Sequence, residues 1–362
     1  MKTIVYIGLS ICLLGSCQDF VQVMDTGQGG ANTQKPKPTE ETETVEVEGE
    51  LATYVRSNHM LSPLSGVSYV DIPYGTNGRN TMDLFIPKSA AADGGHPLVV
   101  FFHGGGFILG NKNAQYKKQA IEKEFSNYLN KGIAVANVNY RLLEAGDQKG
   151  VMKCMEDATL ALQTLKYRAS DLGIDPNRIV LRGQSAGGSM SLWLGLSDDQ
   201  ANPNASDPVE RMSTKVAAVV VNNTQSTLDI QQWENVFTEF DFKFDQGLDA
   251  EMSTRLHGMY GEPMPSSFSR SGFLQKTAEY RSQVDFIALM DAEDPPLFVA
   301  NKPQLSGPPN QKNLLFHHRN HARYLRDRSK EIGGDFHAGN EFHFQENAGL
   351  KVLMGFVEDH LD

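Results

Sequence analysis

The strongest constraint on the fold is a strand, a glycine-flanked serine and a helix that follow one another within residues 179–196. Residues 179–181 are Ile-Val-Leu, typical of a short buried strand, and residues 189–196 have a helical pattern. Between them lies the sequence Gly183-Gln184-Ser185-Ala186-Gly187. Glycines on both sides of Ser185 leave room for a sharp turn, which would present the serine hydroxyl at the start of the helix. Ser185 is therefore the candidate nucleophile.

Strands and helices alternate along the rest of the chain. Continuous apolar runs such as residues 98–102, Leu-Val-Val-Phe-Phe, are typical of strands that are covered on both faces of a parallel sheet. Residues 67–72 and 81–86 are expected to pair as an antiparallel edge hairpin. The pattern predicts an α/β fold with a mostly parallel, doubly wound sheet. The predicted strands are 98–102, 132–138, 179–181, 216–221 and 296–300, and the predicted helices are 113–129, 151–168, 189–196 and 348–361.

A triple glycine directly follows the strand that ends at Phe102. The sequence His103-Gly104-Gly105-Gly106-Phe107 exposes backbone N–H groups, which acyl transfer needs at the place where a negative oxygen forms. We expect the N–H groups of Gly105, Gly106 and Ala186 to form this oxyanion hole. His103 is expected to brace the loop rather than to act as a base.

In these motifs and their order the chain resembles the α/β-hydrolases, in particular the bacterial carboxylesterases and acetyl esterases related to hormone-sensitive lipase. The resemblance is good over residues 67–200. It implies an α/β-hydrolase fold and hydrolysis of carboxylic esters, often acetyl or short acyl esters, with no metal or cofactor. It also implies structural roles for Arg141 and Asp157. The segments that carry it are residues 74–87, 98–107, 139–142, the helix with Asp157, and 175–187.

The general base is expected after the nucleophile and before the last helix, because this fold orders its triad as serine, acid and histidine. Two histidines stand there, His337 and His343. We favour His343, because the resemblance places the base in a loop before an aromatic residue and Phe344 follows it. His337 is the alternative.

The acid of the triad is missing where the resemblance places it. Residues 301–313, which follow the strand at 296–300, contain no Asp or Glu. Asp291, Glu293 and Asp294 precede that strand, and Asp294 is taken as the candidate acid although it starts at the wrong end of the sheet. Glu341 is a further candidate. In serine proteases, disabling the acid lowers kcat roughly 10⁴-fold.

Two functions therefore stay open. The first is a serine carboxylic-ester hydrolase that acts on short-chain or acetyl esters, with envelope or dietary polysaccharides as the acylated substrate. The second is a weak or inactive pseudo-hydrolase that binds a ligand at the cell surface, a hypothesis motivated by the missing acid. Fluorophosphonate labelling of Ser185 would count against the second.

Three further features of the sequence have structural interpretations. His317, His318 and His321 have the spacing of a metal pair on one helix face, but a third ligand is missing, and we interpret them as capping or core histidines. Cys154 lies in an apolar helical pattern and is expected in the core. Residues 223–275 interrupt the strand and helix alternation, and a lid over Ser185 and a packed helical insertion both fit them.

The N-terminal residues have the pattern of a bacterial lipoprotein leader. Lys2 precedes an apolar stretch and the small residues before Cys17, which predicts a signal peptide at 1–16 and a lipidated Cys17. Residues 17–55 are predicted to be an acidic linker and residues 56–362 the hydrolase domain. The protein is expected in the cell envelope, lipid-anchored on the periplasmic or outer-surface face. A net charge of −11 argues against nucleic acid as a partner.

Overall fold

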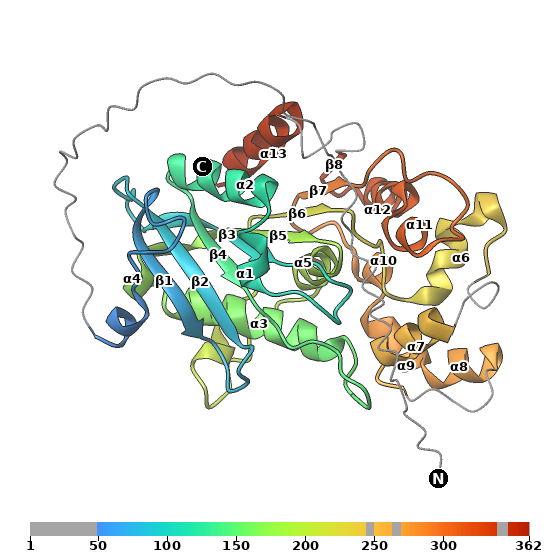
Figure 1. Cartoon of the computed structure of the whole chain (residues 1–362). Helices are drawn as coiled ribbons and strands as arrows, with labels where there is room; N and C mark the ends of the chain where they lie inside the picture. Colours follow the sequence, from blue (N-terminus) through green and yellow to red (C-terminus); the bar gives the residue numbers. More distant parts are fainter. Residues whose placement is uncertain (1–48, 244–249, 263–268, 339–346, 362) are drawn as a thin grey trace, which may run out of the picture. The chain divides into compact units, whose positions relative to one another are not determined.

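A mixed eight-stranded sheet with the order β1-β2-β4-β3-β5-β6-β7-β8 runs through the described part of the computed structural model (Figure 1). The structure describes residues 49–243, 250–262, 269–338 and 347–361. The chain divides into two units, Met1–Glu43 and Thr44–Asp362, and every described residue belongs to the second.

The predicted edge hairpin is confirmed. Strand β1 (Ser65–Pro73) pairs antiparallel with β2 (Thr81–Pro87), and β2 pairs antiparallel with β4 (Ala134–Val138). The alternation Met82, Leu84 against Asp83, Phe85 places successive side chains on opposite faces of the sheet.

The remaining pairs in the sheet are parallel, as the alternating pattern predicts. Strand β5 is longer than predicted, because it continues on both sides of the apolar residues 179–181. Strand β8 has three residues, too few to show an alternation, and was not predicted. These strands are β3 (His96–Phe102), β4, β5 (Ile174–Gln184), β6 (Ala218–Asn222), β7 (Leu297–Ala300) and β8 (Phe336–Ala338).

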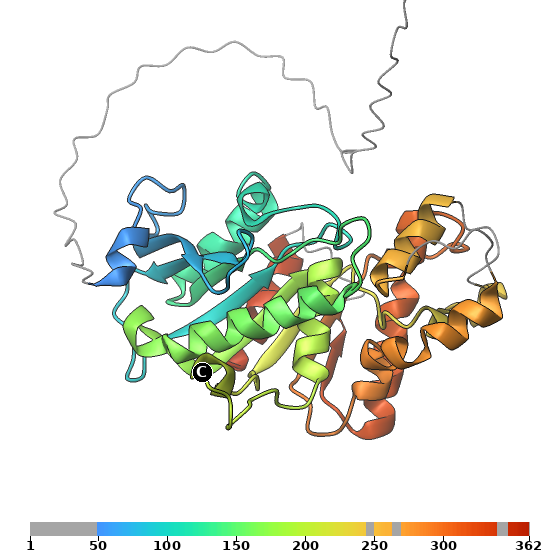
Figure 2. The same ribbon diagram turned by 90° about the horizontal axis from the view of Figure 1, so that it is seen from below.

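Helices cover both faces of the sheet, which explains the continuous apolar strands. Helices α3 (Met152–Tyr167) and α5 (Ala186–Leu196) pack on one face, and α2 (Gln119–Asn130) and α13 (Asn347–Asp359) on the other. In Figure 2 the green helix α3 crosses in front of the strands and the red helix α13 lies behind them. Along β3, Val100 and Phe102 face the first pair of helices, whereas Val99 and Phe101 face the second.

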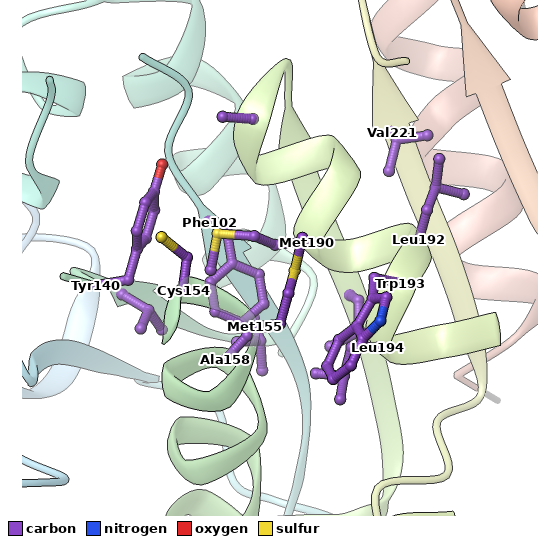
Figure 3. Close-up of a cluster of buried hydrophobic side chains, with 14 of the residues drawn as sticks. Phe102, Tyr140, Cys154, Met155, Ala158, Met190, Leu192, Trp193, Leu194 and Val221 are labelled. Atoms are coloured by element: carbon purple, nitrogen blue, oxygen red, sulfur yellow. The ribbon is translucent and has the colours of Figure 1, made fainter. Parts of the chain in front are cut away.

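The side chains between the sheet and helices α3 and α5 form a hydrophobic core. Phe102, Met155 and Met190 are completely buried and meet between the sheet and the two helices (Figure 3). Cys154 lies in the same cluster, as predicted, and donates to the carbonyl of Arg141. Burial raises the pKa of its thiol well above the ordinary value, which fits an inert core residue.

The segment between β6 and β7 is a helical insertion. It gathers with α11 and α12 beside the β6 to β8 end of the sheet (Figure 1). Its elements are η3 (Ile230–Gln232), α6 (Trp233–Val236), η4 (Thr238–Phe240), α7 (Ala250–Met259), α8 (Arg270–Lys276), α9 (Ala278–Gln283) and α10 (Phe286–Leu289).

After β7 come α11 (Lys312–His317) and α12 (Arg319–Ile332). The shorter elements are η1 (Glu50–Tyr54), α1 (Lys112–Gln115), α4 (Ala169–Leu172) and η2 (Val209–Arg211). The helix predicted at 113–129 is thus split into α1 and α2. Helix η1 lies within the predicted linker, and its Leu51 is buried. Among the described helices, none has the length and apolarity that crossing a bilayer requires.

Candidate active site

Ser185 sits in a tight bend between β5 and α5, at the carboxyl end of the parallel strands. Its backbone is left-handed, with φ 53° and ψ −121°, a conformation rare for a residue with a side chain. A Cβ on Gly183 would lie 2.1 Å from the carbonyl oxygen of Gly187, and one on Gly187 would lie 2.0 Å from that of Phe102. Only glycine fits at either position, so the two glycines allow the close backbone approach in the bend that presents Ser185.

The end of the neighbouring strand β6 holds the bend in place. The N–H of Ser185 donates to the carbonyl of Asn222 at 3.1 Å, at the end of β6. Buried Arg182 donates to the side chain of Asn222 at 2.7 Å and forms an ion pair with Glu124 of α2. The ends of β5 and β6 are therefore fixed to each other beneath Ser185.

The hydroxyl of Ser185 meets a histidine from α11. Ser185 Oγ and His317 Nε2 are 2.9 Å apart, a hydrogen-bond distance. Burial of the ring, with a smaller contribution from the positive charge of Lys302, lowers the pKa of His317 to about 4. The imidazole is therefore neutral at neutral pH, and its Nε2 can take the serine proton.

The opposite ring nitrogen of His317 is held by an amide. Asn313 Oδ1 lies 2.8 Å from His317 Nδ1, one helical turn earlier on α11. An amide oxygen accepts and does not donate, so Nδ1 carries the proton and Nε2 is left as an acceptor toward Ser185. Asn313 thus selects the tautomer that a general base needs, although it brings no negative charge.

Buried side chains on the β6 and β7 loops hold the backbone around His317. Gln225 donates to the carbonyl of Phe316 at 2.6 Å and accepts from Ser189 of α5 at 2.7 Å. Asn301, directly after β7, donates to the carbonyls of Thr224 and His318. These hydrogen bonds link α5, which begins after Ser185, to the helix that carries His317.

Gly104, the first residue of the triple glycine, lies against Ser185. A Cβ on Gly104 would come within 3.4 Å of the Ser185 Cβ. Within the described residues, the N–H groups of Gly105, Gly106 and Ala186 donate to no backbone carbonyl or side chain. Main-chain donors in this loop and at the start of α5 are what an oxyanion hole requires, so these three N–H groups stay the candidates for it.

His103 has the bracing position that the sequence predicts. Its ring is fully buried, stacks on Tyr140 at 4.3 Å, and contacts the carbonyl of Gly104 at 2.8 Å. The hydroxyl of Tyr140 in turn donates to the His103 carbonyl. Arg141 and Asp157 form the framework pair expected of them, with Arg141 Nε 2.9 Å from the carboxylate.

Neither His343, the favoured base, nor His337, its alternative, is found beside Ser185 among the described residues. His343 lies outside the described residues, and so does Glu341. His337 lies on β8, half exposed, where its Nε2 is 2.9 Å from Asp335 and its ring packs on Phe356. The His337 ring therefore packs against α13.

The candidate acid Asp294 lies away from Ser185. It precedes β7, whereas Ser185 follows β5, and these strands are parallel through β6, so the two residues lie at opposite ends of the sheet. Asp294 accepts from the N–H of Asp291, and burial raises its pKa to about 7. The position after β7, where the resemblance expects an acid, holds the buried Asn301.

The histidine cluster is divided among three roles. His318 caps α12 by accepting from the N–H of Asn320, and His321 is buried and contacts Ser226 and the carbonyl of Leu315. For these two the capping and core interpretation is confirmed, but for His317 it is wrong. Among the described residues no group of His, Cys, Asp and Glu could hold a metal ion. The spacing Asn313-x-x-x-His317 on one helix is the sequence signal that could have indicated the hydrogen bond between these two side chains.

A family model described as BD-FAE matches residues 82–304, more than half of the chain and a span that includes Ser185 and the glycine loop. The chain belongs to the BD-FAE family. This makes it an enzyme of the esterase and hydrolase class, which agrees with the α/β-hydrolase part of the resemblance; the narrower branch related to hormone-sensitive lipase stays a prediction.

Curated relatives of this BD-FAE family member match over part of their length. An AB hydrolase superfamily protein of Schizosaccharomyces pombe is 33% identical over 153 residues, 42% of this chain and 41% of that protein. The esterase cest-33 of Caenorhabditis elegans is 29% identical over 223 residues, 54% of this chain and 36% of that protein. The chain therefore spans less than half the length of either.

Solved structures show the same fold at low identity. A truncated form of a carbohydrate esterase from gut microbiota aligns with a TM-score of 0.59 at 15% identity, over 81% of this chain and 96% of that one. A bifunctional GH43-CE protein of Bacteroides eggerthii gives 0.58 at 18%, over 82% and 38%. Esterase 2 of Thermogutta terrifontis gives 0.54 at 17%, over 86% and 98%. The predicted α/β-hydrolase fold is confirmed.

Proposed function

We propose that this BD-FAE family member is a serine carboxylesterase in which Ser185 is the nucleophile and His317 the general base. The observation that carries the proposal is the 2.9 Å contact between Ser185 Oγ and His317 Nε2, at the carboxyl end of the parallel strands, where the glycine loop begins after β3. A neutral imidazole beside a partly buried serine with a strained backbone is the arrangement that activates a hydroxyl for attack.

The reaction follows from these positions. His317 Nε2 takes the hydroxyl proton while Ser185 Oγ bonds to the ester carbon, and the carbonyl oxygen becomes an anion held by the N–H groups of Gly105, Gly106 and Ala186. The imidazolium then gives its proton to the departing alcohol oxygen as that bond breaks. The acyl group stays on Ser185. A water, deprotonated by His317, attacks the acyl carbon, and the acid leaves as Oγ regains its proton.

Asn313 takes the place of the missing carboxylate in this proposal. It orients the ring through Nδ1, but an uncharged amide stabilises the imidazolium less than an aspartate would. Cys-His-Asn sites of papain-like proteases use an amide at the same place in the relay. We therefore expect a working esterase whose kcat is lower than that of an enzyme with a charged triad.

Acylated carbohydrates are the substrate class that we propose, with acetyl or other short acyl groups. The support is the family match and the likeness in fold to proteins whose titles describe carbohydrate esterases. Removal of an acyl group from a sugar hydroxyl needs only the hydrolytic machinery assembled at Ser185.

The test compares turnover of p-nitrophenyl acetate by the wild type and by Ser185→Ala, His317→Ala and His343→Ala. The proposal expects Ser185→Ala and His317→Ala to lose at least about 10³-fold in kcat/KM. Equal rates for wild type and Ser185→Ala would exclude the esterase. Loss in His343→Ala with activity kept in His317→Ala would assign the base to His343.

Labelling by a fluorophosphonate separates the esterase from a ligand-binding pseudo-hydrolase. The wild type should be labelled on Ser185, and Ser185→Ala should not be. Absence of labelling in the folded wild type would favour the binding protein instead.

For location, we propose a lipid anchor on Cys17 in the bacterial cell envelope. Its support is the leader pattern before Cys17. Membrane fractions should contain the wild type, and Cys17→Ser should move it to the soluble or unprocessed fraction.

A further inference from the structure

A cation from the helical insertion lies against the oxyanion loop. A Cβ on Gly106 would be 2.8 Å from Arg255 Nη1 and 3.9 Å from its Cζ. Arg255 belongs to α7, and its side chain is partly buried. The guanidinium therefore borders the backbone that would hold the negative oxygen, although Arg255 is far from Gly106 in sequence.

The position of α7 is fixed by close backbone contacts one turn beyond Arg255. The N–H of Val151 donates to the carbonyl of Met259 at 2.8 Å. A Cβ on Gly150 would lie 2.3 Å from that same carbonyl oxygen, so the two backbones touch. Leu256 and Met259 are buried in the main core. Arg255 is thus carried by a helix anchored to the hydrolase body.

A second cation lies near the other side of the site. Lys302, exposed after β7, is close enough to His317 for its charge to lower the pKa of that ring. Among the described residues, no carboxylate is found to raise that pKa. The Ser185 and His317 pair therefore has positive charge near it in a chain whose net charge is −11.

This distribution favours an anionic substrate. The overall negative charge would repel an acidic polymer, and positive groups near Ser185 and His317 would counter that repulsion at the place where the ester binds. Arginine is suited to this role, because its planar fork can bind a carboxylate through two parallel hydrogen bonds.

We propose that Arg255 is a specificity residue that binds a carboxylate on the substrate, and that the preferred substrates are acyl esters of acidic sugars. The inference rests on the proposed esterase function of Ser185. The ester carbonyl enters the hole at Gly105 and Gly106, and the uronic carboxylate of the same sugar or its neighbour meets the guanidinium beside Gly106.

The test uses two matched substrates, the monoacetyl esters of methyl glucuronoside and methyl glucoside, which differ in a carboxylate against a hydroxymethyl group. Acetate release gives kcat/KM for each. We expect the wild type to prefer the acidic ester by about 10- to 100-fold at low salt, with a smaller preference at high salt. Arg255→Met should bring the ratio close to one, and Arg255→Lys should keep part of it.

Arg270→Met is the matched control, because it removes the same charge from α8, where Arg270 pairs with Glu234. It should leave the ratio of the two substrates unchanged. A wild-type ratio near one, or equal losses on both substrates in Arg255→Met, would overturn the inference while the esterase function stands. Failure of the esterase itself would appear differently, as no acetate release from either substrate.

Discussion

Replacing Asn313 by aspartate tests the proposed relay most directly. The amide oxygen lies 2.8 Å from His317 Nδ1, so Asn313→Asp would place a negative charge about 4 Å from the centre of the imidazolium. Two unit charges at that distance attract by roughly 1 kcal/mol in water and about 4 kcal/mol at an effective dielectric constant of about 20. Asn313 is exposed, so the lower part of that range applies.

At about 1.4 kcal/mol per pKa unit, the charge should raise the pKa of His317 by about 1 to 1.5 units. The starting value is about 4, because the ring is buried near Lys302. A general base works only when neutral, so activity falls as pH drops through its pKa. The acid limb of kcat/KM should therefore move up by about 1 to 1.5 pH units in Asn313→Asp.

The same charge would stabilise the imidazolium that forms in the transition state. We expect kcat at pH 8 to rise by about 3- to 10-fold, which corresponds to roughly 0.7 to 1.4 kcal/mol. The assay is hydrolysis of p-nitrophenyl acetate between pH 4 and 9, with Asn313→Ala as the variant that loses the orienting oxygen. Asn313→Ala should lose about 10- to 100-fold, because the ring can then adopt either tautomer.

Asn310→Asp supplies the control, since it adds the same charge on the exposed loop before α11. It should leave the acid limb within about 0.3 pH units of the wild type. Two results would refute the reasoning. One is an unmoved acid limb in Asn313→Asp, and the other is an equal shift in Asn310→Asp.

Three further predictions follow from packing and charge. Gln225→Leu removes the donor to the Phe316 carbonyl and should lower kcat about 10- to 100-fold. Its control is Gln163→Leu, which loses two hydrogen bonds to carbonyls far from Ser185. That variant should keep kcat and lower only the free energy of unfolding, measured in urea. Asp294→Asn should keep kcat/KM within about twofold. Because burial raises the pKa of Asp294 to about 7, its carboxyl favours folding at low pH and loses that contribution as pH rises toward 7. At pH 8 the free energy of unfolding of Asp294→Asn, measured in urea, should therefore exceed that of the wild type by about 1 to 2 kcal/mol after allowance for solvent exposure, and near pH 4 the two should be equal. Gly187→Ala should cost several kcal/mol, roughly the scale of core overpacking, because its Cβ would lie 2.0 Å from the Phe102 carbonyl, whereas Gly78→Ala, with nothing within 4 Å, should change stability by less than about 0.5 kcal/mol.

Local patterns were enough to predict the strands and helices that surround Ser185. The apolar run at 98–102, the glycines at 183 and 187, and the triple glycine at 104–106 each specify backbone geometry through neighbours in sequence. The helix at 151–168 and the hairpin at 67–86 have clear periodicities of their own. For these elements the structure agrees with the prediction to within a few residues.

The short elements were harder to predict. Strand β8 has three residues, and the predicted helix at 113–129 is broken between Gln115 and Gln119. A periodicity needs more residues than β8 has. The break between α1 and α2 is accompanied by tertiary contacts, because the buried Lys112 pairs with Asp83 of β2.

The sequence by itself determined the fold class, the bend that carries Ser185 and the glycine loop beside it, because steric demands on neighbouring residues decide all three. Only the tertiary structure showed that His317 meets Ser185, that Asn313 stands behind it, and that Asp294 lies at the far end of the sheet. The physical reason is that a hydrogen bond across 132 residues depends on how α11 packs against the β6 and β7 loops. No local pattern around His317 contains that packing.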